Sequence, residues 1–177
     1  AEQLAPYLHH RRTGKPWVVL KMALTLDGRI SAADGSSQWI TGEAARTDAH
    51  LLRARCDGIL VGAQTVRADN PSLTVRHVTG KDPIRIVLGV APPDAAVHPC
   101  WEVDGDFEKV LHSLGERGIV DLLVEGGANV ASNVHRAGLV NEYVFYVAPA
   151  LMGGDDGRPL FAGAGAPTIG DLRRGRI

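Results

Sequence analysis

The run GILVGA at residues 58–63 constrains the fold of this chain more than any other feature of the sequence. It is too short for a stable helix, and its apolar side chains do not alternate with polar ones. This pattern is typical of a strand that is buried on both faces of a parallel sheet. Four further strands are predicted, at residues 17–26, 83–89, 120–127 and 141–149.

Helical patterns separate these strands along the chain. Helices are predicted at residues 39–56, 106–118 and 128–138, and a short one is predicted within residues 64–76. Thr41 is expected to cap the first helix, whereas Gly118 and Gly138 are expected to end the other two long ones. Because strands and helices alternate throughout, we expect an α/β fold with a mostly parallel central sheet flanked by helices.

Composition excludes several classes of protein. The 177 residues, 45% of them hydrophobic, suit one domain. A formal net charge of −1 provides no overall basic field for nucleic acid, and no apolar run reaches the roughly 20 residues of a membrane span. Cys56 and Cys100 show no metal-ligand spacing, so we expect no metal site and a reduced, cytoplasmic setting.

Three regions stand apart from the alternation. Residues 1–16 are polar and end at Pro16, so a linker is expected before a domain at residues 17–177. Residues 91–106 contain too many residues that break helices and strands, three prolines among them, for an element of their own. Residues 150–177 lack the strand that should complete the sheet edge, and parts of the natural chain are therefore suspected to be missing.

A carboxylate and two glycines lie where a predicted strand meets a predicted helix, in the stretch DLLVEGGANVASNV at residues 121–134. Gly126 and Gly127 allow close approach of the backbone, and the start of the helix offers unpaired N–H groups to a phosphate. A tight turn without a ligand explains the glycines about equally well. The stretch is not the G-x-G-x-x-G fingerprint, which disfavours a Rossmann site.

A second candidate region lies at residues 20–41. Lys21 stands in an apolar strand, where a charge is costly unless it is paired. The alternative is a lysine at a strand end that reaches water. The glycine-punctuated loop at residues 27–38 is of the kind that closes over a ligand. Trp39 follows it, and a core position is the alternative to a cofactor contact.

A third group of polar side chains follows the strand at residues 58–63. It comprises Thr65, Asp69 and Arg76, and ligands of open α/β sheets gather at the carboxyl ends of strands. Arg53, late in the preceding helix, adds a fixed cation that suits phosphate. Each residue alone is weakly specific, but together they indicate an anion site.

Other catalytic signatures, among them the nucleophile elbow, the P-loop and the zinc-deaminase motif, are absent from the sequence. Over about residues 6–154 the chain instead resembles the reductase domain of bacterial riboflavin-biosynthesis deaminase/reductases. The resemblance lies in VVLKMALTLDGRISAADGSSQWIT, DAHLLRARCDGILVGAQTVRADNPSLTVR and LLVEGGANVASNVHRAGLVNEYVFYVAPALMGG. The segment APYLHHRRTGKP also resembles the one that joins the deaminase half to the reductase half.

This resemblance implies a dihydrofolate-reductase-like fold and the NADPH-dependent reduction of 5-amino-6-(5-phosphoribosylamino)uracil at C1′ of the opened sugar. It implies catalytic roles for Lys21 and Glu125. It implies that the cofactor is lined by Ala23, Trp39, Thr65, Asp69, Gly127, Ala128, Asn129, Val130, Ala131, Ser132 and Asn133. It implies that the substrate is faced by Ser37, Arg53, Leu73, Arg76 and Glu125, with the arginines as candidates for its phosphate.

The resemblance further implies a homodimer and a deaminase domain that is either fused or separate. The chain departs from the family after Gly89, where it is shorter than expected, and after Met152, where the final antiparallel strands are not recognisable. Two alternatives stay open. One is a dihydrofolate reductase, with Asp48 as the acid facing the pterin, and the other is a catalytically silent NADPH-binding module.

Overall fold

The computed structural model describes residues 4–176, so the first three residues of the expected linker lie outside the described part. The strands are β1 (Trp17–Thr25), β2 (Arg29–Ser31), β3 (Gly58–Gly62), β4 (Ile84–Leu88), β5 (Trp101–Val103), β6 (Asp121–Val124), β7 (Glu142–Ala148) and β8 (Arg158–Pro159). The helices are α1 (Ala5–Thr13), α2 (Glu43–Arg55), α3 (Ala63–Asp69), α4 (Phe107–Glu116), α5 (Ala128–Arg136) and the 3₁₀ turn η2 (Ile169–Asp171).

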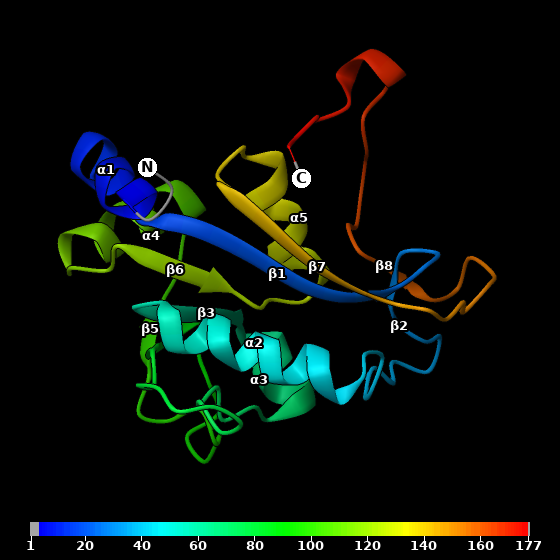
Figure 1. Ribbon diagram of the computed structural model, residues 1–177, viewed down its shortest axis with the longest axis horizontal. Coiled ribbons are helices and arrows are strands. Elements are labelled where there is room, and N and C mark those ends of the chain that lie inside the picture. Colours follow the sequence, from blue (N-terminus) through cyan, green and yellow to red (C-terminus); the bar gives the residue numbers. More distant parts are fainter. Residues whose placement is uncertain (1–3, 177) are drawn as a thin grey trace.

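Six of the strands form a central sheet in the order β5-β4-β3-β6-β1-β7 (Figure 1). Every neighbouring pair in it runs parallel. The predicted α/β fold with a mostly parallel sheet is therefore confirmed. The five strands predicted from apolar runs all form, and β3 is buried along its whole length, as its sequence indicates.

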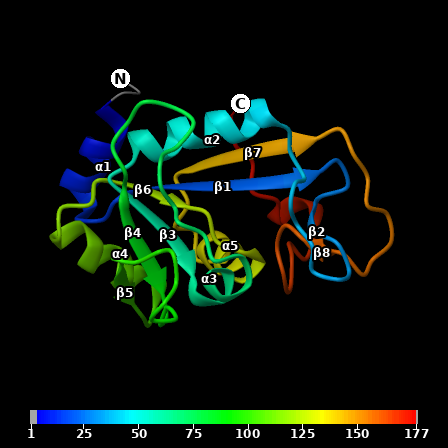
Figure 2. The same ribbon diagram turned by 90° about the horizontal axis from the view of Figure 1, so that it is seen from below.

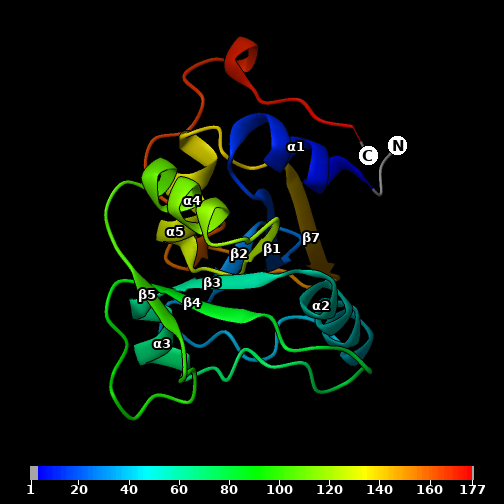
Figure 3. The same cartoon turned by 90° about the vertical axis from the view of Figure 1, so that its left-hand side faces the viewer.

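Helices cover both faces of this sheet, with α1, α4 and α5 on one side and α2 and α3 on the other (Figure 3). Side chains of a strand alternate between faces, so each strand contributes to two cores. Val18 and Leu20 of β1 belong to the core under α4 and α5, whereas Val19 belongs to the core that includes Val66 of α3. These two apolar layers fix the position of the sheet's carboxyl edge, where the polar side chains gather.

Several predictions about local structure are wrong. No element is expected in residues 91–106, but residues 101–103 form strand β5 at the sheet edge. Residues 5–13 form helix α1, which the sequence did not indicate, whereas the linker itself stays a prediction. The first long helix begins after Gly42 and has no side-chain cap, so Thr41 does not cap it. The other helices agree better with the sequence, since Gly118 and Gly138 follow α4 and α5 with positive φ angles.

The C-terminal part of the chain folds back onto the loop after β1. We call residues 152–162 the strap, and Figure 2 shows its strand β8 beside β2. The Asp27 carboxylate accepts hydrogen bonds from the backbone N–H groups of Met152 and Gly153, at 3.2 and 2.8 Å. Arg29 donates to two strap carbonyls, those of residues 154 and 157. The strap thus holds a loop that is more than a hundred residues away in sequence.

Further along, the strap reaches helix α5. The N–H of Ala162 donates to the Ser132 hydroxyl at 2.6 Å, and Arg136 donates to the Ala162 carbonyl at 2.8 Å. Phe161 stacks on the His135 ring. The strap therefore connects the loop after β1 with α5, and no strand was predicted from its sequence.

Helix α1 docks on α4 through two glycines. A Cβ atom added at Gly115 would lie 1.9 Å from the carbonyl oxygen of Gly14, so only glycine permits this approach. The His10 ring donates to the Gly115 carbonyl at 3.1 Å, and Lys15 pairs with Glu108. These contacts make α1 part of the folded domain.

We expect the Gly115→Ala substitution to lower the free energy of unfolding by about 2 kcal/mol. Overpacking against a backbone oxygen costs up to about 3 kcal/mol, and the better helix propensity of alanine returns about 1 kcal/mol. Urea denaturation followed by circular dichroism measures the change. Ser113→Ala, at an exposed position of the same helix, is the control and should change stability by less than about 0.5 kcal/mol. Equal stability of the two variants would contradict the docking of α1.

Candidate functional site

A cavity of about 560 Å³ lies at the carboxyl edge of the sheet. Its floor comes from the middle of β1 and the ends of β3 and β6, and its walls come from the loop after β1, from α3, from the start of α5 and from the strap. The residues that line it are Lys21, Met22, Ala23, Ile30, Ser31, Asp34, Gly35, Ser37, Ile40, Gly62, Gln64, Thr65, Ala68, Asp69, Glu125, Gly126, Gly127, Ala128, Asn129, Val130 and Arg158. Such a position is the usual ligand site of an open α/β sheet.

Strand register brings Lys21 and Glu125 together on this floor. Leu20 of β1 pairs with Val124 of β6, so the next residue of each strand lies at the same level. Both side chains point to the face that carries α2, because strand side chains alternate. The Lys21 Nζ atom lies 3.8 Å from the Glu125 Oε2 atom, and the two side chains are only 16% and 10% exposed.

Arg53 of α2 holds the Glu125 carboxylate from the opposite side. Its Nε and Nη2 atoms donate to the two carboxylate oxygens at 2.8 and 2.9 Å, and its Nη1 atom donates to the Thr74 carbonyl at 3.2 Å. A bidentate pair of this kind fixes both side chains. Three charges thus meet in a nearly buried cluster, two positive and one negative.

The charge state of Glu125 follows from these partners. Burial acts to raise the pKa of Glu125, but the hydrogen bonds from Arg53 and the charges of Lys21 and Arg53 outweigh it. The pKa of Glu125 therefore lies below its ordinary value. At neutral pH the floor of the cavity carries a carboxylate, which can only accept hydrogen bonds.

The glycine pair after Glu125 fulfils its predicted steric role. A Cβ atom at Gly126 would lie 2.6 Å from the Cβ atom of Val130, and one at Gly127 would lie 3.3 Å from the Thr65 hydroxyl oxygen. Gly127 is the N-terminal cap of α5 and places no side chain over the first amides of the helix. The uncapped N–H groups and the helix dipole suit a phosphate, and the start of α5 lines the cavity.

Many residues that the resemblance implies for cofactor and substrate lie around this one cavity. They are Lys21, Ala23, Ser37, Thr65, Asp69, Glu125, Gly127, Ala128, Asn129 and Val130. They come from four separate segments of the chain, which the sheet topology brings together. Their roles stay predictions, because a shared cavity does not assign a ligand to any of them.

Four residues implied for the cofactor do not line the cavity. Trp39 is 71% exposed, and the Arg46 guanidinium covers its ring at 4.8 Å. Ala131 and Ser132 point into the packed side of α5, where the Ser132 hydroxyl donates to the Ala128 carbonyl and accepts from the strap. Asn133 is exposed and accepts a hydrogen bond from Arg136.

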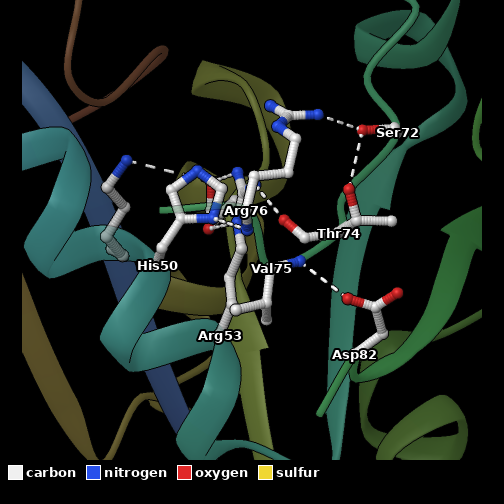
Figure 4. A network of polar contacts seen from close by, with 9 residues as sticks. His50, Arg53, Ser72, Thr74, Val75, Arg76 and Asp82 are labelled. Atoms are coloured by element: carbon white, nitrogen blue, oxygen red, sulfur yellow. Dashed lines mark hydrogen bonds and ion pairs between the residues drawn. The ribbon is translucent and has the colours of Figure 1, made fainter. Parts of the chain in front are cut away.

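Three residues implied for the substrate, Arg53, Leu73 and Arg76, do not line the cavity either. Leu73 is 3% exposed and has a positive φ angle of 54°, which is unusual for a leucine and bends the segment after α3. The Arg76 guanidinium is exposed and pairs with the Ser72 hydroxyl. Figure 4 shows the network that joins this segment to α2.

Sequence reasoning missed several cavity residues and one buried histidine. Arg158 lies on the short strand β8, Gln64 opens α3, and Ile30 lies on β2. Ile30 and Gln64 lie in stretches that the sequence marks as candidate regions, but nothing singles out these two side chains, and nothing in its local sequence indicates Arg158. His50 is 5% exposed on α2 and contacts the network behind Glu125. Its position one helical turn before Arg53 is the only signal that the sequence offers.

Within residues 4–176, no group of three or more His, Cys, Asp or Glu side chains is arranged to hold a metal ion. Over the same residues, no helix is both long and apolar enough to cross a membrane.

Comparison with known proteins agrees with the fold. The riboflavin biosynthesis protein RibD of Mycobacterium tuberculosis is 45% identical over 165 residues, which cover 87% of this chain and 48% of that protein. RibD of Chlamydia muridarum is 37% identical over 198 residues and is covered to 52%. The chain therefore spans about half the length of these curated relatives.

Solved structures give the same result. Acinetobacter baumannii RibD superposes with a TM-score of 0.88 and 31% identity, over 98% of this chain and 57% of that one. The Saccharomyces riboflavin biosynthesis reductase Rib7 superposes with a TM-score of 0.65 and 26% identity, over 90% of this chain and 86% of that one. The family model of the RibD C-terminal domain matches residues 16–174. This chain therefore belongs to the RibD C-terminal domain family, the reductase domain of riboflavin biosynthesis.

Proposed function

We propose that this domain reduces the ribosyl side chain of 5-amino-6-(5-phosphoribosylamino)uracil to the ribityl product, with NADPH as the hydride donor. Membership of a reductase family supports a nicotinamide cofactor. The likeness to Rib7, which this chain covers to 86%, supports a reductase activity in this domain alone. The choice of substrate and of NADPH rests on the resemblance of the sequence motifs.

The Lys21–Glu125 pair at the cavity floor carries the proposal. A cation and an anion, each nearly buried, lie side by side next to a helix N-terminus that suits phosphate. Perturbed and partnered charges in a cleft are a common mark of an active site. A purely structural ion pair would not need to face the cavity, whereas both of these residues line it.

The cofactor fits the helix side of the cavity. NADPH, when bound, supplies the hydride that reaches C1′ of the opened sugar. The backbone amides from Gly127 to Val130 would hold its pyrophosphate, and Thr65 and Asp69 of α3 would contact its polar groups. Asp69 and Asp34 add negative charge elsewhere in the wall, so the uncapped amides are the favourable place for phosphate.

The substrate fits the strand side. Glu125 would accept hydrogen bonds from N–H or O–H groups of the uracil or the sugar. Arg53 is already engaged by Glu125 and the Thr74 carbonyl, so its role is to orient Glu125. Arg76, whose guanidinium is exposed, is the better candidate for the phosphate of the sugar.

Reduction also requires a proton at the sugar oxygen or the imine nitrogen. Lys21 lines the cavity, and its Nζ atom lies 3.8 Å from the Glu125 carboxylate. It would either deliver this proton or polarise the reacting group while water delivers it. The Glu125 carboxylate holds the ammonium group in place for either task.

The two alternative functions gain less support. A dihydrofolate reductase would require Asp48 to face a pterin, but Asp48 accepts a hydrogen bond from the Tyr146 hydroxyl at 2.6 Å and does not line the cavity. A catalytically silent NADPH-binding module would need no charged pair on the substrate side. From the length of the relatives, we also propose that a deaminase domain accompanies this domain. The resemblance of the sequence motifs to the family is the basis on which we propose a homodimer.

The direct test incubates the protein with NADPH and the deaminated phosphoribosyl pyrimidine and follows the loss of absorbance at the nicotinamide band. We expect oxidation of NADPH that depends on this substrate and not on dihydrofolate. Oxidation with dihydrofolate alone would favour the first alternative. Binding of NADPH without oxidation by either compound would favour the silent module.

We expect Lys21→Ala to lower kcat by at least about 100-fold, the usual size of a lost acid–base contribution. The affinity for NADPH should stay within about twofold, because Lys21 lies on the substrate side of the cavity. Stopped-flow NADPH oxidation measures turnover, and nicotinamide fluorescence measures binding. Lys109→Ala, at an exposed position of α4, is the matched control. If Lys21→Ala turned over as fast as the wild type, Lys21 would have no role in the chemical step.

We expect Glu125→Gln to weaken substrate binding and also to lower the free energy of unfolding at pH 7 by about 3 kcal/mol, because it leaves the buried Arg53 without its anion. Calorimetry measures the first effect and urea denaturation the second. Glu116→Gln, at an exposed position, is the control. An unchanged substrate affinity would argue against contact with Glu125.

The stability effect of Glu125 should depend on pH. Its folded-state pKa lies below the ordinary value of 4.5. The contribution of the carboxylate is therefore fully present above pH 4.5 and is lost as the pH falls through the folded-state pKa. The stability gap between wild type and Glu125→Gln should narrow in acid. A gap that is constant down to pH 3 would contradict this assignment.

A further inference from the structure

The segment from Asn70 to Arg76 has no regular secondary structure, yet it presents Leu73 and Arg76 behind the cavity floor. An irregular segment keeps one conformation only where its backbone groups find fixed partners. The partners here come from outside the segment. The inference below concerns the most buried of them, and it rests on the proposed function because it treats Arg76 as a substrate contact.

Three side chains hold the backbone of this segment. Asp82 accepts from the Val75 N–H at 2.7 Å, and Arg53 donates to the Thr74 carbonyl at 3.2 Å. His50 accepts from the Arg76 N–H through its Nδ1 atom at 3.2 Å. Figure 4 shows His50 and Arg53 reaching from α2 toward this segment. Of the three, only His50 fixes the backbone of Arg76 itself.

The surroundings of His50 keep its ring neutral. Burial lowers the pKa of His50 first, and the positive charges of Arg53, His77 and Arg76 lower it further, to about 4, against a smaller opposing effect of Glu125. The His77 ring packs edge-on against it at 4.6 Å between centroids. A neutral ring can accept at Nδ1 while its proton stays on Nε2, whereas a protonated ring has no acceptor at all.

We propose that His50 is a positioning residue of the substrate site: its Nδ1 atom fixes the backbone of Arg76 and thereby aims the Arg76 guanidinium at the phosphate of the sugar. The contact explains why a histidine, rather than a lysine or an arginine, lies among these cations. A permanently charged side chain at this position would repel Arg53 and Arg76 and could not accept the N–H. A purely apolar side chain would leave that N–H without its partner.

A pair of nearly isosteric variants separates this role from general packing. Asparagine places its amide oxygen near the position of Nδ1, whereas glutamine places it near the position of Nε2. His50→Asn should therefore keep the bond to Arg76, and His50→Gln should lose it. Both variants lose the ring that contacts His77, so the loss of this contact does not contribute to the difference between them.

We expect His50→Gln to weaken binding of ribose 5-phosphate and to raise KM for the substrate by about tenfold, the effect of one lost anchoring hydrogen bond. For His50→Asn, the affinity for ribose 5-phosphate and the KM for the substrate should both stay within about threefold of the wild-type values. In both variants, kcat and the affinity for NADPH should be unchanged. Calorimetry with ribose 5-phosphate, with ribose as the unphosphorylated control, measures binding without any turnover.

The proposal is overturned if the asparagine and glutamine variants bind ribose 5-phosphate equally well, or if His50→Gln loses kcat and NADPH affinity to the same extent as KM rises. If His50→Gln does not fold, the ¹⁵N spectrum of histidine-labelled wild-type protein decides. A ring that carries its proton on Nε2 from pH 8 to pH 5 supports the contact, and a proton on Nδ1 excludes it.

The failure of this inference is distinguishable from that of the proposed function. A wild-type protein that binds ribose 5-phosphate but does not oxidise NADPH overturns the reaction, and the binding comparison still tests His50. A wild-type protein that does not bind ribose 5-phosphate overturns the positioning role. Normal binding and turnover in wild type with indistinguishable variants overturns the inference alone.

Discussion

The bidentate pair between Arg53 and Glu125 is the interaction on which the arrangement of the site depends. It joins α2 to the end of β6, and Lys21 in the middle of β1 completes it. Burial of one of these charges alone would cost several kcal/mol, so each requires the others. The pair therefore adds little net stability. It is what allows three charged groups to lie at the edge of an apolar sheet.

Because Arg53, Glu125 and Lys21 depend on one another, the charged residues of the site have different tasks. Arg53 uses its guanidinium within the protein, and Glu125 keeps only part of its capacity to accept hydrogen bonds for a ligand. Arg76 is left with an exposed guanidinium on a segment whose backbone is fixed by side chains. The resemblance assigns Arg53, Glu125 and Arg76 to the substrate, but only the contacts separate those that hold the site from those that could face a ligand.

Much of the fold follows from local sequence, because burial on both faces leaves a clear apolar run for each central strand. The glycines after Glu125 were also predictable, since close approach of the backbone requires them. Helix α1 was not predicted, because its polar sequence gains stability only from docking at Gly115. Strand β5 has three residues and pairs with β4 alone, so its local sequence could not indicate it.

The candidate site shows the same limit. Its floor could be predicted from residues next to strand ends, whereas the strap, Arg158 and His50 depend on contacts across the whole chain. The bonds that join Asp27 and Arg29 to the strap span 125 to 128 residues of sequence. Contacts of such long range form slowly, because the entropy of closing the intervening chain must be lost before they form. On the ribosome, this wall of the cavity can close only after residue 162 has emerged, so the chain completes its sheet before it acquires a binding site.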